Sequence, residues 1–182
     1  IITINPIEEA GLKRFINPQD PMAILRGGQV ITDLFLQVRI NEDVALLKAI
    51  MKLLLQWESD GQSVFDHAFI EEKTSGWEAY VDDLRQYALD DLIQRSGVDR
   101  DKIEEACRLI ASSQRIIICW AMGLTQHKNG VDNIQECVNI LLAKGAIGKP
   151  GAGTCPVRGH SNVQGDRTVG IMHHPSPTLT AA

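Results

Sequence analysis

The apolar run Ile116–Ile118, inside the segment RIIIC at 115–119, constrains the fold more than any other stretch of the chain. Its residues are β-branched and do not alternate with polar ones. A strand with one solvated face alternates, whereas a parallel strand covered on both faces reads as a continuous apolar run. We therefore predict a central parallel strand at 115–119, with helices packed on both faces of its sheet.

Other strands and helices can be assigned around this run. The apolar stretches 1–5 and 34–38 predict two more short strands. Asp43 is expected to cap a helix whose apolar residues recur at spacings of three and four, and Ser75 and Asp99 are expected to cap two further helices. The order of the elements indicates an α/β protein with a three-layer αβα arrangement.

The remaining chain is predicted as follows. Short helices are expected at 65–72 and about 77–88, and a helix at 131–143 with Val131 on its buried face. Polar stretches with Gly or Pro at 10–32 and 57–63 are expected to be loops.

Three parts can be distinguished along the chain. Residues 1–145 carry the periodic patterns of an α/β domain, 146–170 are rich in Gly, and 171–182 have the character of a tail. A long aperiodic segment in a compact domain is usually functional or disordered. The chain begins at Ile1 without Met, which favours a fragment or a processed chain.

Charge and composition exclude several classes of protein. The net charge of −5 argues against a general nucleic-acid binder, whose surface would be basic. No apolar run approaches the roughly 18 residues of a membrane span. None of the four cysteines forms a CxxC pair, and a reduced, cytoplasmic protein is the simplest interpretation.

A short segment that could carry ligand-binding residues follows each of the three predicted strands. These segments are residues 5–8, 41–43 and 120–127. Ligands of open parallel sheets bind beyond the carboxyl ends of the strands, so we expect these segments to meet at one edge. The Asp43 carboxylate could accept hydrogen bonds from two donors of a guanine, and Gly123 would let backbone approach a phosphate.

Simpler roles remain open for the same residues. Asp43 can serve only as a helix cap, and Asn5, which precedes Pro6, only as a turn residue. Met122 can serve as core filler, whereas Gln126 offers both a donor and an acceptor to a ligand.

The Gly-rich segment 146–168 is the second candidate for a binding site. Its glycines stand among Arg158, His160 and Asn162, so it could surround an anionic ligand with backbone N–H groups and guanidiniums. The alternative is a mobile linker, although linkers are usually rich in Ser or Glu. No dinucleotide fingerprint, P-loop or HExxH motif occurs, and the pair His173-His174 is interpreted as part of the tail.

Taken together, these motifs resemble the family of enzymes that bind two molybdopterin guanine dinucleotides (bis-MGD). Formate dehydrogenases, periplasmic nitrate reductases and dimethyl sulfoxide reductase belong to this family, and the resemblance is greatest to formate dehydrogenase-like members. The resemblance implies a Rossmann-like parallel sheet. The matching segments follow the family's order and are residues 4–6, 41–49, 120–133 and 146–171.

The resemblance also implies roles for individual residues. Asn5 matches a segment that contacts one guanosine, and Asn41, Glu42 and Asp43 match the segment that holds the guanine edge. The other positions expected to contact the cofactor are Met122, Gly123, Gln126, Gly159 and Asn162.

Arg158 and His160 are the residues that the resemblance implies for catalysis. Arg158 matches an arginine beside the metal, where a guanidinium suits an anionic substrate. His160 stands where family members that act on formate usually have Gln, and Ile7 where Arg is common.

The implied cofactor is bis-MGD with molybdenum or tungsten, and the family's metal ligand and iron–sulfur cysteines have no counterpart in this chain. A 4Fe-4S cluster is therefore expected only in a full-length parent, and no metal site is expected here. The expected partners are the remaining domains of that parent and a small anionic substrate, with neither nucleic acid nor membrane. Self-association of the chain through uncovered apolar surface is also expected. The alternative functions are a non-catalytic nucleotide-binding module and an inactive structural fragment.

Overall fold

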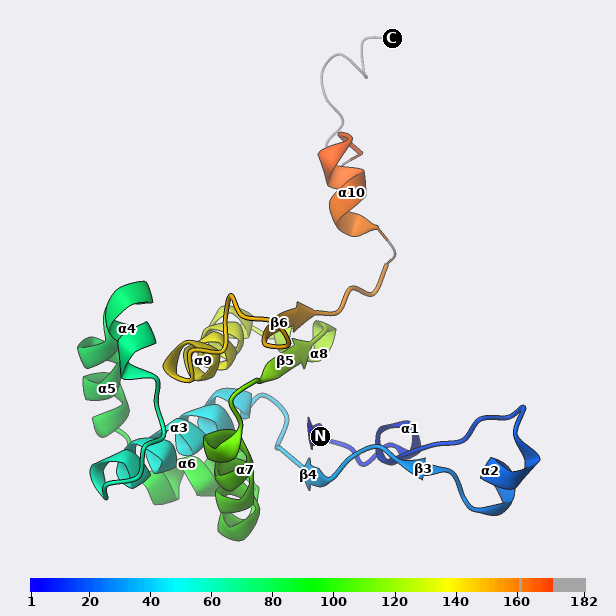
Figure 1. The fold of residues 1–182 in the computed structure, drawn as a ribbon, viewed down its shortest axis with the longest axis horizontal. Coiled ribbons are helices and arrows are strands. Elements are labelled where there is room, and N and C mark those ends of the chain that lie inside the picture. The colour runs from blue at the N-terminus through cyan, green and yellow to red at the C-terminus, as the bar shows by residue number, and fades with distance from the viewer. Residues whose placement is uncertain (161, 172–182) are drawn as a thin grey trace.

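The computed structural model describes residues 1–160 and 162–171. Figure 1 shows a helical body, an N-terminal arm that extends to one side of it, and a C-terminal helix that stands apart from both. Along the chain the elements are β1 (Ile2–Ile4), α1 (Ala10–Lys13), β2 (Arg14–Phe15), α2 (Pro21–Leu25), β3 (Gln29–Val30), β4 (Leu34–Leu36), α3 (Asp43–Ser59), α4 (His67–Lys73), α5 (Trp77–Arg85), α6 (Leu89–Ser96), α7 (Arg100–Ser112), β5 (Ile117–Trp120), α8 (Met122–Thr125), α9 (Gly130–Ala143), β6 (Gly153–Pro156) and α10 (Val163–Thr168).

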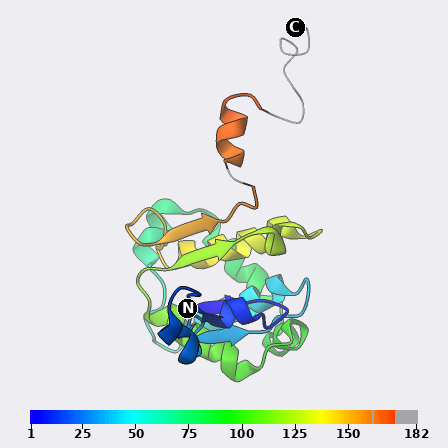
Figure 2. The same ribbon diagram turned by 90° about the vertical axis from the view of Figure 1, so that its right-hand side faces the viewer.

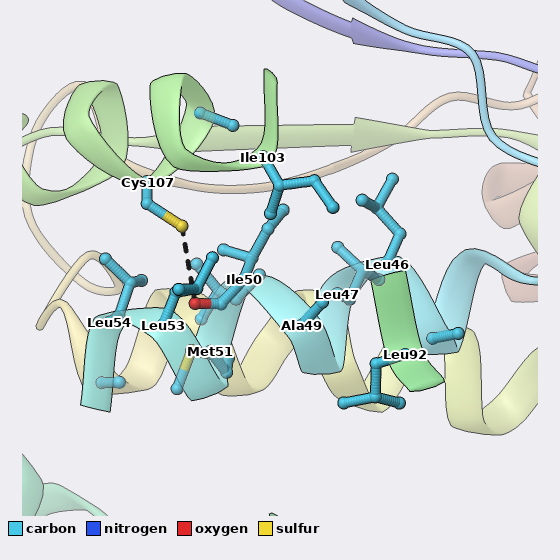
Figure 3. Packing of buried hydrophobic residues seen from close by; sticks show 14 of the residues in the cluster. Leu46, Leu47, Ala49, Ile50, Met51, Leu53, Leu54, Leu92, Ile103 and Cys107 are labelled. Carbon is cyan, nitrogen blue, oxygen red and sulfur yellow. Dashed lines mark hydrogen bonds between the residues drawn. The ribbon is translucent and has the colours of Figure 1, made fainter. Parts of the chain in front are cut away.

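Helix α3 lies at the centre of the core. It packs against α6, α7 and α9, and apolar residues cover most of its circumference, as expected for a helix enclosed by other helices. Figure 3 shows Leu92 of α6 and Ile103 and Cys107 of α7 next to it, with the Cys107 thiol donating to the Ile50 carbonyl over 3.6 Å. The buried apolar side chains of α3 are Ala45, Leu46, Leu47, Ala49, Ile50, Met51, Leu53 and Leu54.

The strands form three two-stranded sheets in the described part of the chain. β1 pairs with β4 and β5 pairs with β6, both in parallel, and β2 and β3 form an antiparallel pair. The predicted α/β class is therefore confirmed, as are the strands expected near 1–5 and 34–38. Figure 2 shows the β5–β6 pair above the β1–β4 pair, as two separate parallel units.

The prediction that the strand at 115–119 is covered on both faces is wrong. β5 alternates between exposed and half-buried residues, and Ile117 is 56% exposed. Ile118 and Trp120 pack against the helical core, whereas Ile117 and Cys119 point to the other face. An apolar run shows that a strand favours burial. It does not show that other parts of this chain pack on both faces of the strand.

Two of the predicted helix caps are also wrong. Asp43 is the first residue of α3, while Glu42 occupies the N-cap without a capping hydrogen bond from its side chain. Gly76, with φ of 78°, precedes α5 in place of Ser75. The Asp66 carboxylate caps α4 by accepting a hydrogen bond from the third backbone N–H of that helix, a cap that the sequence patterns did not predict.

Three stretches expected to be irregular contain regular structure. Residues 10–32 include α1, β2, α2 and β3, and α3 continues to Ser59 inside the predicted loop 57–63. The Gly-rich segment 146–168 includes β6 and α10, and α6 was not separately expected. Elements of two to six residues contain too few positions for a periodic pattern.

The C-terminal part of the chain leaves the body after β6. In both ribbon views α10 stands apart from the helical core. The division into parts at 145 and 170 stays a prediction, although β6 shows that the second part enters the body. His173, His174 and nearly all of the predicted tail lie outside the described residues. Within the described ranges, no helix is long and apolar enough to cross a membrane.

Candidate functional site

The ends of β1 and β4 are held side by side. The Asn5 N–H donates to the Leu36 carbonyl over 3.2 Å, one step beyond the paired strands. The Gln37 amide donates to the Pro6 carbonyl over 3.1 Å. The Asn5 side-chain amide donates to the Ile7 carbonyl over 2.6 Å and closes a local turn. The two strand ends therefore meet as predicted, and the Asn5 side chain has the turn-forming contact considered as its simpler role.

The turn between β4 and α3 carries Asn41 and Glu42. Asn41 is exposed and has φ of 68°, in the left-handed region that Asn tolerates better than most residues. Glu42 accepts from both the Nη2 and the Nε of Arg95, at 2.9 and 3.1 Å. This two-nitrogen contact fastens the turn to α6, so the Glu42 carboxylate already has a strong partner within the protein.

Asp43 is the buried carboxylate of this edge, with only 9% of the residue exposed. Burial raises the pKa of Asp43 above its ordinary value, while its own backbone N–H and His127 act to lower it. Asp43 begins α3, directly after β4 and its turn, and His127 follows β5. The pKa of Asp43 therefore responds to a residue that follows the other parallel strand pair.

Helix α8 begins directly after β5 and carries a second group of predicted residues. The Gln126 amide donates to the Met122 sulfur over 3.4 Å. Gly159, beyond β6, lies against the same side chain, because a Cβ placed there would be 3.4 Å from Met122 Cε. Open space surrounds Gly123. The structure thus brings together Met122, Gln126 and Gly159, which are distant in the sequence.

Arg158 and His160 follow β6 on an exposed segment. The ladder continues past the strands, since the Val157 N–H donates to the Trp120 carbonyl over 2.7 Å. Arg158 therefore emerges beside α8, and no ion pair engages it within the described residues. A guanidinium in this position can bind an anion through two nitrogens.

Asn162 is not brought to this group. It precedes α10 with φ of 58°, and its amide approaches the Asp166 carboxylate at 3.5 Å. Figure 1 shows that α10, the helix that Asn162 precedes, stands apart from α8. We use the name strand-end site for the residues that do lie at the strand ends: Asn5, Asn41, Glu42, Asp43, Met122, Gly123, Gln126, His127, Arg158 and Gly159.

Two residues that the sequence patterns did not single out hold the segment after β5 in place. A Cβ at Gly130 would lie 2.6 Å from the Thr125 carbonyl oxygen, so α9 approaches this segment as closely as glycine allows. The Asn133 side chain is fully buried and donates to the Leu124 carbonyl over 2.9 Å. The predicted buried face of this helix is wrong at Val131, which is 71% exposed. No local pattern marks Gly130 and Asn133 for this role, because the role depends on how closely α9 approaches its neighbour.

A cavity of about 310 Å³ opens beside the turn that leads to Asn41. Arg39 and Lys102 contribute two positive charges to its lining and Asp99 one negative charge. The Arg39 guanidinium is held by a hydrogen bond to the Gln94 carbonyl at 2.7 Å. Within residues 1–160 and 162–171, no group of three or more His, Cys, Asp or Glu residues is arranged to hold a metal ion.

Comparison with known proteins relates the chain to oxidoreductases. It is 45% identical to an uncharacterized oxidoreductase of Mycobacterium tuberculosis over 183 residues, which cover all of this chain and 24% of that protein. It is 35% identical to the alpha subunit of an F420-dependent formate dehydrogenase of Methanococcus maripaludis over 149 residues, covering 82% of this chain and 21% of that protein. The chain thus spans about a quarter of the length of such relatives. No protein-family model matches it.

A solved structure shows the same fold. Acetylene hydratase from Pelobacter acetylenicus superposes with a TM-score of 0.62 over 82% of this chain and 18% of that chain, at 20% sequence identity. The arrangement of helices and short parallel strands therefore recurs as one part of a much longer enzyme chain.

Proposed function

We propose that this chain is part of the cofactor-binding domain of a molybdopterin oxidoreductase, and that its strand-end site contacts bis-MGD. One observation carries the proposal. Met122 and Gly159 are in contact beyond the carboxyl ends of β5 and β6, and Asn5 and Asp43 follow the carboxyl ends of β1 and β4. Ligands of α/β proteins bind at such ends, and these residues lie on segments that resemble the family.

The chemistry of the donor set fits this cofactor. A guanine presents two donors on one edge, which an ionised Asp43 can accept. The cofactor's phosphates require positive charge, and Arg39 and Lys102 provide it at the cavity next to the turn 40–42. When bound, the metal and pterin supply the two-electron redox chemistry, and the protein positions them.

The remaining roles in this proposal belong to the exposed segment after β6 and to the parent protein. Arg158 would orient a small anionic substrate, and His160 leaves formate unassigned as that substrate. The metal ligand and the 4Fe-4S cluster would come from the rest of a longer parent chain. A cytoplasmic location agrees with the four free cysteines.

The test uses the full-length parent. Metal and pterin analysis of the purified protein should find molybdenum or tungsten together with molybdopterin guanine dinucleotide. Asp43→Asn should reduce the cofactor content, because a neutral amide cannot accept from both guanine donors, while the exposed Asp60→Asn should leave it unchanged. A parent that contains no pterin would refute the proposal.

A non-catalytic nucleotide-binding module is the second candidate, because the cavity beside the turn 40–42 already combines two cations with a nearby carboxylate. Calorimetry of the isolated chain with guanosine monophosphate and diphosphate would test it. Binding that Asp43→Ala abolishes, together with a parent that contains no pterin, would favour this function. Failure of both nucleotides to bind would remove it and leave the inactive structural fragment as the other alternative.

A further inference from the structure

β5 and β6 place two cysteines opposite each other. The register of this parallel pair aligns Cys119 with Cys155. Figure 2 shows the two strands side by side at the border of the body. Side chains at paired positions of neighbouring strands point to the same face of the sheet. Both cysteines are free and exposed, on the face of β5 that the helical core does not cover.

The two thiols also interact with each other. The pKa of Cys119 is raised, first by partial desolvation and then by hydrogen bonding and charge interaction with Cys155. The other two cysteines differ, since Cys107 and Cys137 are buried and burial raises the pKa of each to about 12. The chain therefore contains one accessible pair of thiols and two shielded ones.

We infer that Cys119 and Cys155 form a redox-active dithiol, which a low-molecular-weight disulfide such as oxidised glutathione converts to a cross-strand disulfide. Neighbouring strands lie about 4.8 Å apart, and the Cα atoms of a disulfide lie about 4.4–6.8 Å apart. The register thus provides the separation that the bond needs without movement of the backbone. The inference does not depend on the proposed cofactor.

The reaction proceeds by two thiol–disulfide exchanges. One cysteine thiolate attacks the external disulfide, so that a mixed disulfide forms and one molecule of the small thiol leaves. The second cysteine thiolate then attacks the protein sulfur of the mixed disulfide, forming the internal bond and releasing the second small thiol. Two electrons pass from the cysteines to the external disulfide, and the two thiol protons end on its products.

The disulfide would tie together the strands that carry two walls of the strand-end site. Met122 follows β5 and Arg158 follows β6, each a few residues beyond its cysteine. Among the described residues, β5 and β6 are joined by the hydrogen bonds of a two-stranded ladder. A covalent bond at the centre of this ladder would prevent β6 from separating from β5 and would hold Arg158 beside α8.

The experiment treats the full 182-residue chain with oxidised glutathione and identifies the products by mass spectrometry and peptide mapping. We expect a loss of two hydrogens and a peptide joining Cys119 to Cys155. Titration of native thiols should fall from two accessible groups to none. Cys107 and Cys137 serve as internal controls that react only after unfolding.

Single variants test the order of the exchange. In Cys119→Ser and in Cys155→Ser the remaining exposed thiol should stop at a stable mixed disulfide with glutathione, because no second thiol can displace it. Circular dichroism establishes that both variants are folded. A wild-type chain that keeps glutathione on either cysteine, forms disulfides only between molecules, or joins Cys107 or Cys137 would overturn the inference.

Discussion

The helical core and the strand-end site differ in whether their charged groups have partners within the protein. In the core, Tyr80 donates to the Glu136 carboxylate over 2.6 Å, and Lys48 pairs with Asp83 at 2.6 Å while facing Glu136 at 3.8 Å. Each buried charge there has a partner, as a stable interior requires. At the strand ends, Arg158 is exposed without an ion pair in the described ranges.

The buried carboxylates of Asp43 and Glu136 show the same contrast. Burial raises the pKa of Asp43 against the smaller lowering effects of its own backbone N–H and of the charge of His127, whereas Glu136 accepts a hydrogen bond from Tyr80 and faces Lys48. Packing and pairing therefore account for the polar residues of the core, whereas Asp43 and Arg158 of the strand-end site form no ion pair among the described residues. Side chains that contribute little to the fold are the ones best explained by a ligand.

The largest expected difference between the two regions is in the cost of removing an apolar side chain. Leu54 of α3 is fully buried, and Leu54→Ala should lower the free energy of unfolding by about 2–5 kcal/mol because a cavity remains. Ile117 of β5 is 56% exposed, so Ile117→Ala should cost about 1 kcal/mol or less. Urea denaturation measures both, and equal losses would show that the two regions are packed alike.

A smaller effect is expected where the two regions join. Gly130→Ala would place a methyl group 2.6 Å from the Thr125 carbonyl oxygen, so α9 and the segment after β5 must separate. We expect a loss of about 1–3 kcal/mol of stability. Gly123→Ala is the matched control, because open space surrounds Gly123 and alanine is favourable in a helix. A Gly130→Ala variant as stable as this control would mean that the close approach is not needed.

Replacing Asp43 should have the opposite effect at neutral pH and raise the stability of the chain. Its folded-state pKa lies above the ordinary value of 3.8, so its contribution to stability is present below the unfolded-state pKa and is lost as pH rises through the folded-state pKa. Asp43→Asn should therefore stabilise the isolated chain at neutral pH.

The pH dependence of that gain tests its cause. The difference between Asp43→Asn and the wild type should shrink as the pH falls through 3.8, the ordinary pKa, because the wild-type carboxyl then becomes protonated in both states. Asp91→Asn, on the exposed side of α6, is the control and should change little at either pH. A destabilised Asp43→Asn variant at neutral pH would show that this carboxylate supports the fold.

The sequence predicted the core better than the strand ends, and the reason is physical. The helix from Asp43 has a long apolar pattern, and such a pattern determines burial through many residues at once. β6 consists of GTCP, which has no apolar pattern, and forms only because β5 offers it a ladder. Its pairing depends on a contact between distant residues, which local patterns do not contain.

The sequence predicted which segments form the strand-end site, but it did not predict which residues contact one another there. The rule that ligands bind beyond the carboxyl ends of parallel strands selected the turn at 41–43 and the segment after β5, and His127 of that segment influences the pKa of Asp43. The positioning roles of Gly130 and Asn133 could not be predicted, because they depend on how closely α9 approaches its neighbour. The contact between Glu42 and Arg95 likewise joins the turn before α3 to α6, which lies far along the chain.

Arg158 should have the smallest effect on stability and, if the proposed function holds, a large one on activity. Its exposed side chain makes no ion pair among the described residues, so Arg158→Ala should change the stability of the isolated chain by less than about 0.5 kcal/mol. In the full-length parent the same change should reduce turnover by about 100-fold with cofactor content unchanged, because the anionic substrate loses its positioning group.

Arg167→Ala, an exposed arginine on α10, is the matched control and should leave turnover unchanged. Arg158→Lys should restore only part of the lost activity, since an ammonium carries the charge without the planar two-nitrogen contact. Full activity in Arg158→Ala would remove Arg158 from the catalytic residues. Equal losses in the two alanine variants would instead indicate a general requirement for positive charge in the chain after β6. Arg158 would then no longer distinguish the strand-end site from the core.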